Sequence, residues 1–238
     1  MNDFSQIYVV GDIHGCRVLL KKIMQKIIEM SKNTTGPKLI IYLGDYIDRG
    51  PEIKETIQTL LDFQPIDFQR IFLLGNHEQM MLDFIKGEPD SLYLWILNGG
   101  DKTLNSYGVK AITFFEGIIK NDKTIRGQLI KKIPKDHLQF FNNLSLSYQY
   151  NDYLFVHAGI DPDIALNKQD KQVMIWTRGI TYPKDFQKII VHGHTPQLEI
   201  EDLPNRINLD TGAFYSGILS CLLIDSKNGK RQFFNTKK

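Results

Sequence analysis

The first third of the chain repeats one unit: a short apolar run, a polar motif and then an amphipathic segment. The apolar runs occupy residues 7–10, 38–43 and 70–74, and each ends at a motif that begins with glycine. Residues 17–30 and 53–63 place apolar side chains at helical spacing. Strands that alternate with helices predict an α/β fold with largely parallel strands, whose carboxyl ends gather the polar residues.

The rest of the chain is predicted to add helices and then further strands. Helical patterns at 80–85, 92–97 and 134–144 predict a helical cap over about residues 79–144. Strand patterns return in four later segments: 153–156, 188–191, 206–209 and 218–224. The sequence has no low-complexity linker and no other internal repeat, so a single domain over residues 1–238 is expected.

Composition narrows the class of protein. The 238 residues carry 29 basic and 27 acidic side chains, so a concentrated basic surface for nucleic acid is not expected. No stretch approaches the roughly 20 apolar residues that a membrane span needs. The two cysteines, Cys16 and Cys221, are too few for a disulfide framework in a chain of this size. A protein of the cytoplasm is therefore predicted, with no nucleic-acid or membrane partner.

Five polar motifs carry most of the reactive side chains, and each begins where a predicted strand ends. They contain five of the six histidines, and only His137 lies outside them. Each motif alone has an ordinary explanation as a turn, but their joint occurrence at strand ends does not. The motifs are Gly11-Asp12-Ile13-His14-Gly15, Gly44-Asp45-Tyr46-Ile47-Asp48-Arg49-Gly50, Gly75-Asn76-His77-Glu78, Val156-His157-Ala158-Gly159 and His192-Gly193-His194-Thr195-Pro196.

The residue types in these motifs suit metal chemistry. Carboxylate, imidazole and amide oxygen together form a mixed shell that favours manganese, iron or zinc, whereas magnesium and calcium favour oxygen alone. One carboxylate of the second motif can bridge two ions about 3.5–4 Å apart. Two such ions lower the pKa of a bridging water, which then attacks in line, so no protein nucleophile is needed.

With these motifs the sequence resembles the metallophosphoesterases, and among them the phosphoprotein phosphatase branch that includes the lambda-phage protein phosphatase. GDxHG, GDYxDRG and GNHE are specific to that branch, and the likeness runs from Gly11 to about Gly217. Bacterial serine/threonine protein phosphatases also share Trp95-x-x-Asn98-Gly99-Gly100 and Asp210-Thr211-Gly212-Ala213. The resemblance implies a calcineurin-like domain, folded as a four-layer sandwich of two mixed β-sheets flanked by helices. It also implies two bound divalent ions, with Mn²⁺ expected and Fe or Zn as alternatives.

The resemblance also implies a role for each motif residue. Asp12 and His14 hold the first ion and Asp45 bridges. The second ion is held by Asn76, His157 and His194. The phosphoryl oxygens are bound by Arg49, Asn76 and Arg178. The leaving alkoxide is protonated by His77, whose ring is oriented by Asp48; these two residues and the two arginines form the catalytic set.

Four further residues need separate interpretation. Arg178 lies in Trp176-Thr177-Arg178, but the family places an acidic residue next, where this chain has Gly179. His192 is interpreted either as structural or as a support for the metal ligands, and Glu78 as a hydrogen-bond acceptor at the start of a helix. His137 is predicted to be exposed on a polar helix face.

The resemblance predicts a metal-dependent phosphomonoesterase that acts on phosphoserine and phosphothreonine in proteins, with phosphotyrosine and small phosphoesters as further substrates. The alternative is symmetrical cleavage of diadenosine tetraphosphate. Phosphodiesterase or nuclease activity is disfavoured because Pro196 follows His194-Thr195, where those branches use Gly-His-x-His. A non-catalytic binding module is disfavoured because no expected ligand is missing. The sequence leaves the physiological substrate and the oligomeric state open.

Overall fold

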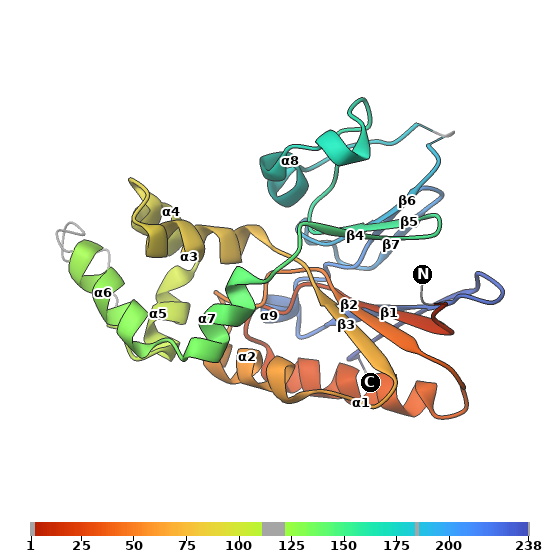
Figure 1. Cartoon of the computed structure of the whole chain (residues 1–238), viewed down its shortest axis with the longest axis horizontal. Coiled ribbons are helices and arrows are strands. Elements are labelled where there is room, and N and C mark those ends of the chain that lie inside the picture. The colour runs from red at the N-terminus through yellow and green to blue at the C-terminus, as the bar shows by residue number, and fades with distance from the viewer. Residues whose placement is uncertain (1–2, 111–121, 184–185, 238) are drawn as a thin grey trace.

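The computed structural model describes residues 3–110, 122–183 and 186–237, and its centre is a pair of five-stranded sheets (Figure 1). The strands of the first sheet are β1 (Gln6–Val10), β2 (Lys38–Tyr42), β3 (Phe68–Phe72), β9 (Ser220–Asp225) and β10 (Arg231–Asn235). Their order is β10-β9-β1-β2-β3. The pairs β1–β2 and β2–β3 are parallel, whereas β9 is antiparallel to both of its neighbours. The sheet is therefore mixed.

The second sheet repeats this mixture of directions. Its strands are β4 (Ser147–Tyr150), β5 (Tyr153–Val156), β6 (Ile189–His192), β7 (Glu201–Leu203) and β8 (Arg206–Asn208). Their order is β4-β5-β6-β8-β7. The inner pairs β5–β6 and β6–β8 are parallel, and the two edge strands are antiparallel to their neighbours. The α/β class and the two mixed sheets are confirmed.

Two amphipathic helices cover the outer face of the first sheet: α1 (Arg17–Ser31) and α2 (Ile53–Asp62) (Figure 1). Both predicted helices are confirmed and differ from the prediction only at their last residue. Helix α1 buries Leu20, Ile23 and Ile27 at helical spacing, and these side chains share a core with Tyr8 and Val10 of β1. The alternate residues of β1 face the other way, into the core between the sheets.

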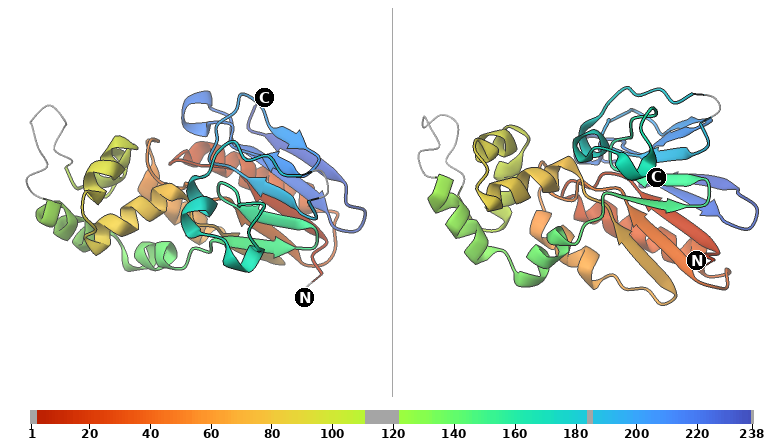
Figure 2. Two further views of the ribbon diagram at one scale, coloured as in Figure 1. Left: turned by 90° about the horizontal axis from the view of Figure 1, so that it is seen from above. Right: turned by 45° about the horizontal axis from the view of Figure 1, so that its top comes forward.

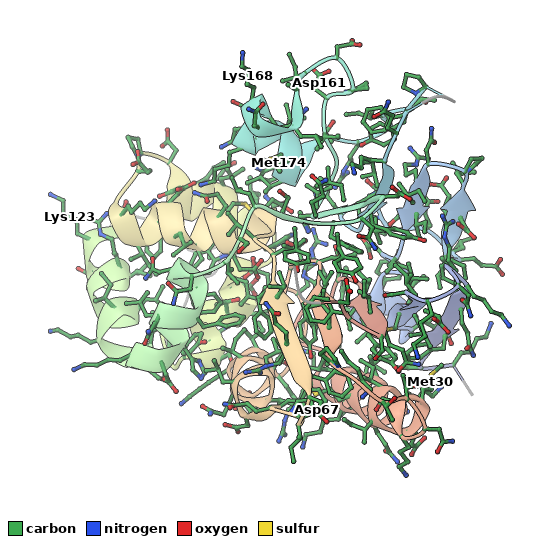
Figure 3. All side chains as sticks on the ribbon, turned by 45° about the vertical axis from the view of Figure 1, so that its right-hand side comes forward. Met30, Asp67, Lys123, Asp161, Lys168 and Met174 are labelled. Carbon is green, nitrogen blue, oxygen red and sulfur yellow. The ribbon has the colours of Figure 1, made fainter. Side chains whose placement is uncertain are left out.

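The outer layer over the second sheet is thin. It consists of helix α8 (Lys171–Trp176), a short 3-10 turn at Leu166–Lys168 and connecting loops. Met174 and Ile175 of α8 pack against Leu154 and Val156 of β5. Figure 3 shows Met174 and the α1 residue Met30 on opposite sides of the molecule, with both sheets between them. The four-layer sandwich is therefore confirmed, with one outer layer made of two long helices and the other mainly of loops.

Five helices in the described part of residues 76–142 form a group beside the sheets (Figure 2). They are α3 (Asn76–Lys86), α4 (Ser91–Leu97), α5 (Gly100–Ser106), α6 (Asp122–Lys132) and α7 (Lys135–Asn142). The predicted helical cap corresponds to this group, although its residues 111–121 lie outside the described ranges. No helix among the described residues is long and apolar enough to cross a membrane.

The third predicted strand is displaced by two residues. It was expected at 70–74, but β3 covers Phe68–Phe72, and Leu73 instead forms a single bridge to Ser145. The following helix begins at Asn76 rather than at residue 80, because Glu78 accepts a hydrogen bond from the backbone N–H of Gly75 and caps it. The first turn of α3 therefore carries the whole Asn76-His77-Glu78 motif.

The prediction that His137 is exposed is wrong. His137 has no exposed surface and lies on the buried face of α7 together with Phe140 and Phe141. Its Nε2 donates to Gln58 Oε1 at 3.1 Å, and its Nδ1 accepts from the Tyr107 hydroxyl at 2.8 Å. The spacing of three and four residues between His137 and the two phenylalanines was the available signal.

Burial gives His137 a predictable effect on acid stability. Burial lowers the pKa of His137 below its usual value, so the folded protein favours the neutral ring. As the pH falls, His137 therefore protonates at a higher pH in the unfolded chain than in the folded protein. The folded protein should lose stability as the pH decreases below about 6.5. Replacing His137 with glutamine keeps a donor and an acceptor but removes the titration. Between about pH 8 and about pH 5.5, we expect the melting temperature of the unmodified protein to fall more than that of the variant. A constant difference would contradict this role.

Candidate metal centre

The predicted ligands lie together at one edge of the sandwich. Asp12, Asp45 and Asn76 follow the carboxyl ends of the parallel strands β1, β2 and β3, and His157 and His194 follow β5 and β6. All of these residues and His14 are buried, with at most 4% of their surface exposed. The close packing of the two sheets therefore brings together motifs that are far apart in sequence.

The loops that carry these residues are strained. Eight non-glycine residues in the described ranges have a positive φ. Five of them are predicted site residues: His14, Asp45, Asp48, Arg49 and His194. A non-glycine residue in this region costs about 1–3 kcal/mol, so surrounding contacts must hold it there. This concentration of strain marks the loops as a functional site.

Asp45 lies between two groups of histidines. Its Oδ2 is 3.5 Å from His14 Nε2 and 3.9 Å from His77 Nε2. Its Oδ1 is 3.4 Å from His157 Nε2, in a group that also contains His194. Candidate ligand atoms within each group lie within 4.8 Å of one another. The two oxygens of one carboxylate thus face two separate clusters that could each hold a cation.

The second cluster places two imidazole nitrogens against one amide oxygen. His157 Nδ1 donates to the carbonyl of Leu43 at 2.9 Å, so its Nε2 carries a lone pair. His157 Nε2 and His194 Nδ1 each lie 3.0 Å from Asn76 Oδ1. The other nitrogen of the His194 ring, Nε2, lies 3.2 Å from both Arg178 Nε and the Trp176 carbonyl. The lone pairs of His157 Nε2 and Asn76 Oδ1 repel each other at this spacing, and a bound cation removes the conflict.

The first cluster is built in the same way. His14 Nδ1 donates to the carbonyl of Ile47 at 2.8 Å, and its Nε2 faces Asp45. Burial, and next the neighbouring His77, lower the pKa of His14 to about 3. Burial and then His157 lower the pKa of His194 to about 3 as well. Both rings are therefore neutral bases over the physiological range, the form that binds a metal.

Asp12 completes the test of whether a metal fits. Its Oδ2 accepts from the backbone N–H of His194 at 2.9 Å, but its Oδ1 is buried without a hydrogen-bond partner among the described residues. Burial, followed by Asp210 and Asp45, raises the pKa of Asp12 above its usual range. A cation would stabilise the ionised form and satisfy the free oxygen. The donor set therefore fits divalent metal ions, and the prediction for Asp12 is compatible with the geometry.

Asp210 is a buried carboxylate close enough to Asp12 to raise its pKa, and it is not among the predicted site residues. It is 3% exposed, and its Oδ1 accepts from the backbone N–H of Gly212. In the sequence it belongs to Asp210-Thr211-Gly212-Ala213, one of the stretches that carry the family resemblance. Its strand-end position after β8 was a signal of the same kind as those of the five motifs.

His77 and Asp48 form a buried pair beside Asp45. His77 Nδ1 donates to Asp48 Oδ2 at 2.6 Å, which leaves Nε2 facing the metal clusters. Burial alone would lower the pKa of His77, but Asp45 and then Asp48 reverse this, and the net pKa is raised. The ring is thus oriented and biased toward its protonated form.

The cap helices hold the other end of this pair. Trp95 of α4 donates its indole N–H to both oxygens of Asp48, at 2.9 and 3.1 Å. Thr103 of α5 donates its hydroxyl to Asp48 and accepts from the Asp48 backbone N–H at 3.0 Å. Trp95 belongs to a stretch that carries the family resemblance, but the contact of Thr103 with Asp48 was not predicted, because no local pattern connects a cap helix to a loop after β2.

The two predicted phosphate-binding arginines approach from different elements. Arg49 is half-buried, and its Nη1 lies 3.1 Å from His14 Nε2. Arg178 is exposed, and its Nε lies 3.2 Å from His194 Nε2. Each guanidinium therefore sits beside a histidine of a different cluster. Arg206 donates to the carbonyl of Ile180 at 2.6 Å and so supports the loop that carries Arg178.

Glu78 is a hydrogen-bond acceptor at the start of α3, as predicted, and His192 lies outside the predicted ligand set. The carboxylate of Glu78 accepts from the backbone N–H groups of Asp45, Tyr46 and Ile47 at 2.8–3.1 Å, so it ties the bridging loop to the first turn of α3. His192 is buried, and its Nδ1 donates to the carbonyl of Gly193 at 2.9 Å. Neither side chain belongs to the two clusters around Asp45.

This chain is similar in sequence to known phosphatases and tetraphosphatases, and similar in fold to a solved structure. Serine/threonine-protein phosphatase 2 of Salmonella typhimurium is 28% identical over 229 residues, which cover 91% of this chain and 92% of that protein. The asymmetrical bis(5'-nucleosyl)-tetraphosphatase PrpE of Oceanobacillus iheyensis is 25% identical over an alignment of 246 positions, which covers 93% of this chain and 90% of that protein. A solved protein inferred to be a diadenosine tetraphosphatase has the same fold, with a TM-score of 0.67 at 18% identity over 100% of this chain and 96% of its own.

The family itself is decided by a match over most of the chain. The profile of the Calcineurin-like phosphoesterase family matches residues 5–217, which include all five polar motifs. The chain belongs to the calcineurin-like phosphoesterase family and is a metal-dependent hydrolase.

Proposed function

We propose that this protein is a two-metal phosphomonoesterase that removes phosphate from phosphoserine and phosphothreonine in proteins, and also from phosphotyrosine and small phosphoesters. The carrying observation is the position of Asp45, whose two oxygens face different histidine clusters 3.4–3.5 Å away. A carboxylate in that position could bridge two ions, and two such ions would stabilise both the attacking and the leaving oxygen of an in-line displacement at phosphorus.

In this proposal Asp12 and His14 would hold one divalent ion, and Asn76, His157 and His194 would hold the other. Asp45 would contribute to both. The mixture of nitrogen and oxygen donors favours manganese, with iron and zinc as alternatives. When bound, the two ions would lower the pKa of a water molecule and neutralise charge that develops on the phosphoryl group.

The arginines and the amide bind the substrate phosphate. Arg49 and Arg178 each present a planar set of donors beside a different cluster, a geometry that suits two phosphoryl oxygens. Asn76 offers its amide N–H₂ to a phosphoryl oxygen, because its Oδ1 faces the two histidines. The phosphoryl group is thereby oriented before the phosphorus–oxygen bond breaks.

His77 supplies the proton for the leaving group. As the ester bond breaks, both bonding electrons stay on the substrate oxygen, and the proton on His77 Nε2 moves to it. Asp48 holds the ring through Nδ1 and stabilises the protonated form, while Trp95 and Thr103 fix Asp48. A positioned acid of this kind contributes about 10²–10⁴-fold to the rate.

The second candidate is a dinucleoside tetraphosphatase. It is favoured by the PrpE relative, whose name specifies asymmetrical cleavage, whereas the family resemblance had suggested the symmetrical reaction. The same metal site could serve both reactions. We rank the tetraphosphatase second because the two arginines beside the site suit a terminal phosphoryl group.

A substrate panel tests the proposed function. Purified protein supplied with manganese should release phosphate from p-nitrophenyl phosphate and from phosphoserine, phosphothreonine and phosphotyrosine peptides. The same samples are assayed with diadenosine tetraphosphate, and the products are separated to distinguish the two cleavage patterns. Turnover of the tetraphosphate with none of the monoesters would overturn our proposal in favour of the second candidate.

A further inference from the structure

Two exposed aromatic rings lie at the border of the metal site. The short helix α9 (Ala213–Ser216) presents Phe214, which is 39% exposed, and Tyr215, which is 58% exposed. Their ring centroids are 5.0 Å apart, with the planes at 88°. None of the metal, phosphate or proton-transfer roles described above uses either ring.

Phe214 contacts both kinds of side chain that surround the phosphate position. The Arg49 guanidinium carbon lies 5.2 Å from the centre of the Phe214 ring, a cation–π contact. The His14 ring lies 5.5 Å from it, edge to face at 80°. A partly exposed ring that touches a proposed metal ligand and a proposed phosphate-binding arginine lies at the mouth of the site.

The backbone around α9 holds this ring in place. Gly212 has φ of 65°, a conformation that favours glycine, and a side-chain carbon there would clash with the Tyr215 ring. The Ser216 hydroxyl donates to the carbonyl of Thr211 at 2.7 Å, and the Thr211 hydroxyl donates to the carbonyl of Ile218 at 2.8 Å. The ring of Phe214 is therefore presented by a preorganised turn, which reduces the ordering cost of binding.

Leaving groups differ in how close an aromatic ring can lie to the phosphate. In an aryl phosphate the ring is bonded directly to the ester oxygen, so it stays close to the phosphate that Arg49, in contact with Phe214, is proposed to bind. The side chains of phosphoserine and phosphothreonine are too small to cover an aromatic ring. A nucleobase is separated from the phosphate by a sugar, and in a tetraphosphate by further phosphates, so it projects beyond this contact.

We propose that Phe214 is a specificity-determining residue that favours aryl phosphate monoesters, with phosphotyrosine as the biological class, over phosphoserine and phosphothreonine. This inference rests on the proposed phosphomonoesterase function. Aromatic pairs prefer offset or edge-to-face contact, and the exposed 39% of Phe214 is the surface that a substrate ring would contact.

The test compares kcat/KM for two peptides of the same sequence, one with phosphotyrosine and one with phosphothreonine. Phe214→Leu keeps an apolar side chain but removes the aromatic ring, and Phe214→Tyr keeps the ring. We expect Phe214→Leu to lower the phosphotyrosine-to-phosphothreonine ratio about fivefold to tenfold, and Phe214→Tyr to preserve it. Any loss caused by a displaced Arg49 affects both peptides and cancels in the ratio.

Tyr215→Leu is the matched control. It removes the neighbouring and more exposed ring, which packs over Gly212, and its ratio should stay within about twofold of that of the unmodified protein. Melting temperatures confirm that each variant is folded.

Three results would overturn the role of Phe214. An unchanged ratio in Phe214→Leu overturns the inference but leaves the phosphomonoesterase function standing. A selective loss of diadenosine tetraphosphate turnover assigns the ring to nucleobases and also overturns it. If the unmodified protein hydrolyses none of the monoesters, the proposed function fails and the inference with it.

Discussion

Replacing Asp45 with asparagine is expected to abolish phosphate release. The amide has no negative charge and cannot bridge two cations as a carboxylate does, so both metal sites weaken together. Metal ions contribute several kcal/mol of transition-state stabilisation, so we expect turnover of p-nitrophenyl phosphate to fall roughly 10³-fold or more. Metal analysis of the same sample should show a loss of bound manganese.

Asp67 provides the matched control for this change. It also has a positive φ, but it is exposed in the turn before β3 and lies at the edge of the molecule in Figure 3. Asp67→Asn should leave activity and metal content unchanged, because asparagine tolerates the same backbone conformation. An Asp45→Asn protein that keeps both ions and its turnover would show that Asp45 is not the bridge.

Replacing His77 with asparagine should slow catalysis while the metal content stays the same. His77 donates a hydrogen bond from Nδ1 to Asp48. Its only proposed role in the reaction is to protonate the leaving group from Nε2, so the metal ions do not depend on it. We expect kcat for a phosphothreonine peptide to fall about 10²–10⁴-fold. The loss should be smaller for p-nitrophenyl phosphate, because nitrophenolate leaves readily without protonation.

This difference between substrates separates an acid from a structural residue. A structural defect would lower both rates by the same factor and would reduce the melting temperature. His77 also belongs by distance to the cluster around His14 and Asp45, which makes the metal content an essential readout. Loss of one ion in His77→Asn would identify His77 as a metal ligand and contradict its assignment as the acid.

The fold and the convergence of the motifs were predictable because they depend on local signals. Apolar runs that end at Asp12, Asp45 and Asn76 mark strand ends, and parallel strands bring such ends to one edge. His157 and His194 come from the second sheet, so their approach to Asn76 depends on how the sheets pack. The resemblance supplied that pairing, whereas periodicity alone could not.

The remainder depends on tertiary packing that leaves no local pattern. The carbonyls of Leu43 and Ile47 fix the ring orientation of His157 and His14, but a backbone acceptor has no sequence signature. Thr103 reaches Asp48 across 55 positions. His137 was predicted wrongly because its polarity was given more weight than its spacing from the buried phenylalanines of α7.

The most direct test of the two-metal account is the turnover of p-nitrophenyl phosphate as a function of manganese bound per chain. Metal-free protein is titrated with manganese, and bound metal and phosphate release are measured on the same samples. We predict negligible turnover without metal and a plateau when two ions are bound per chain. Full activity at one ion per chain, or in protein without metal, would contradict the account.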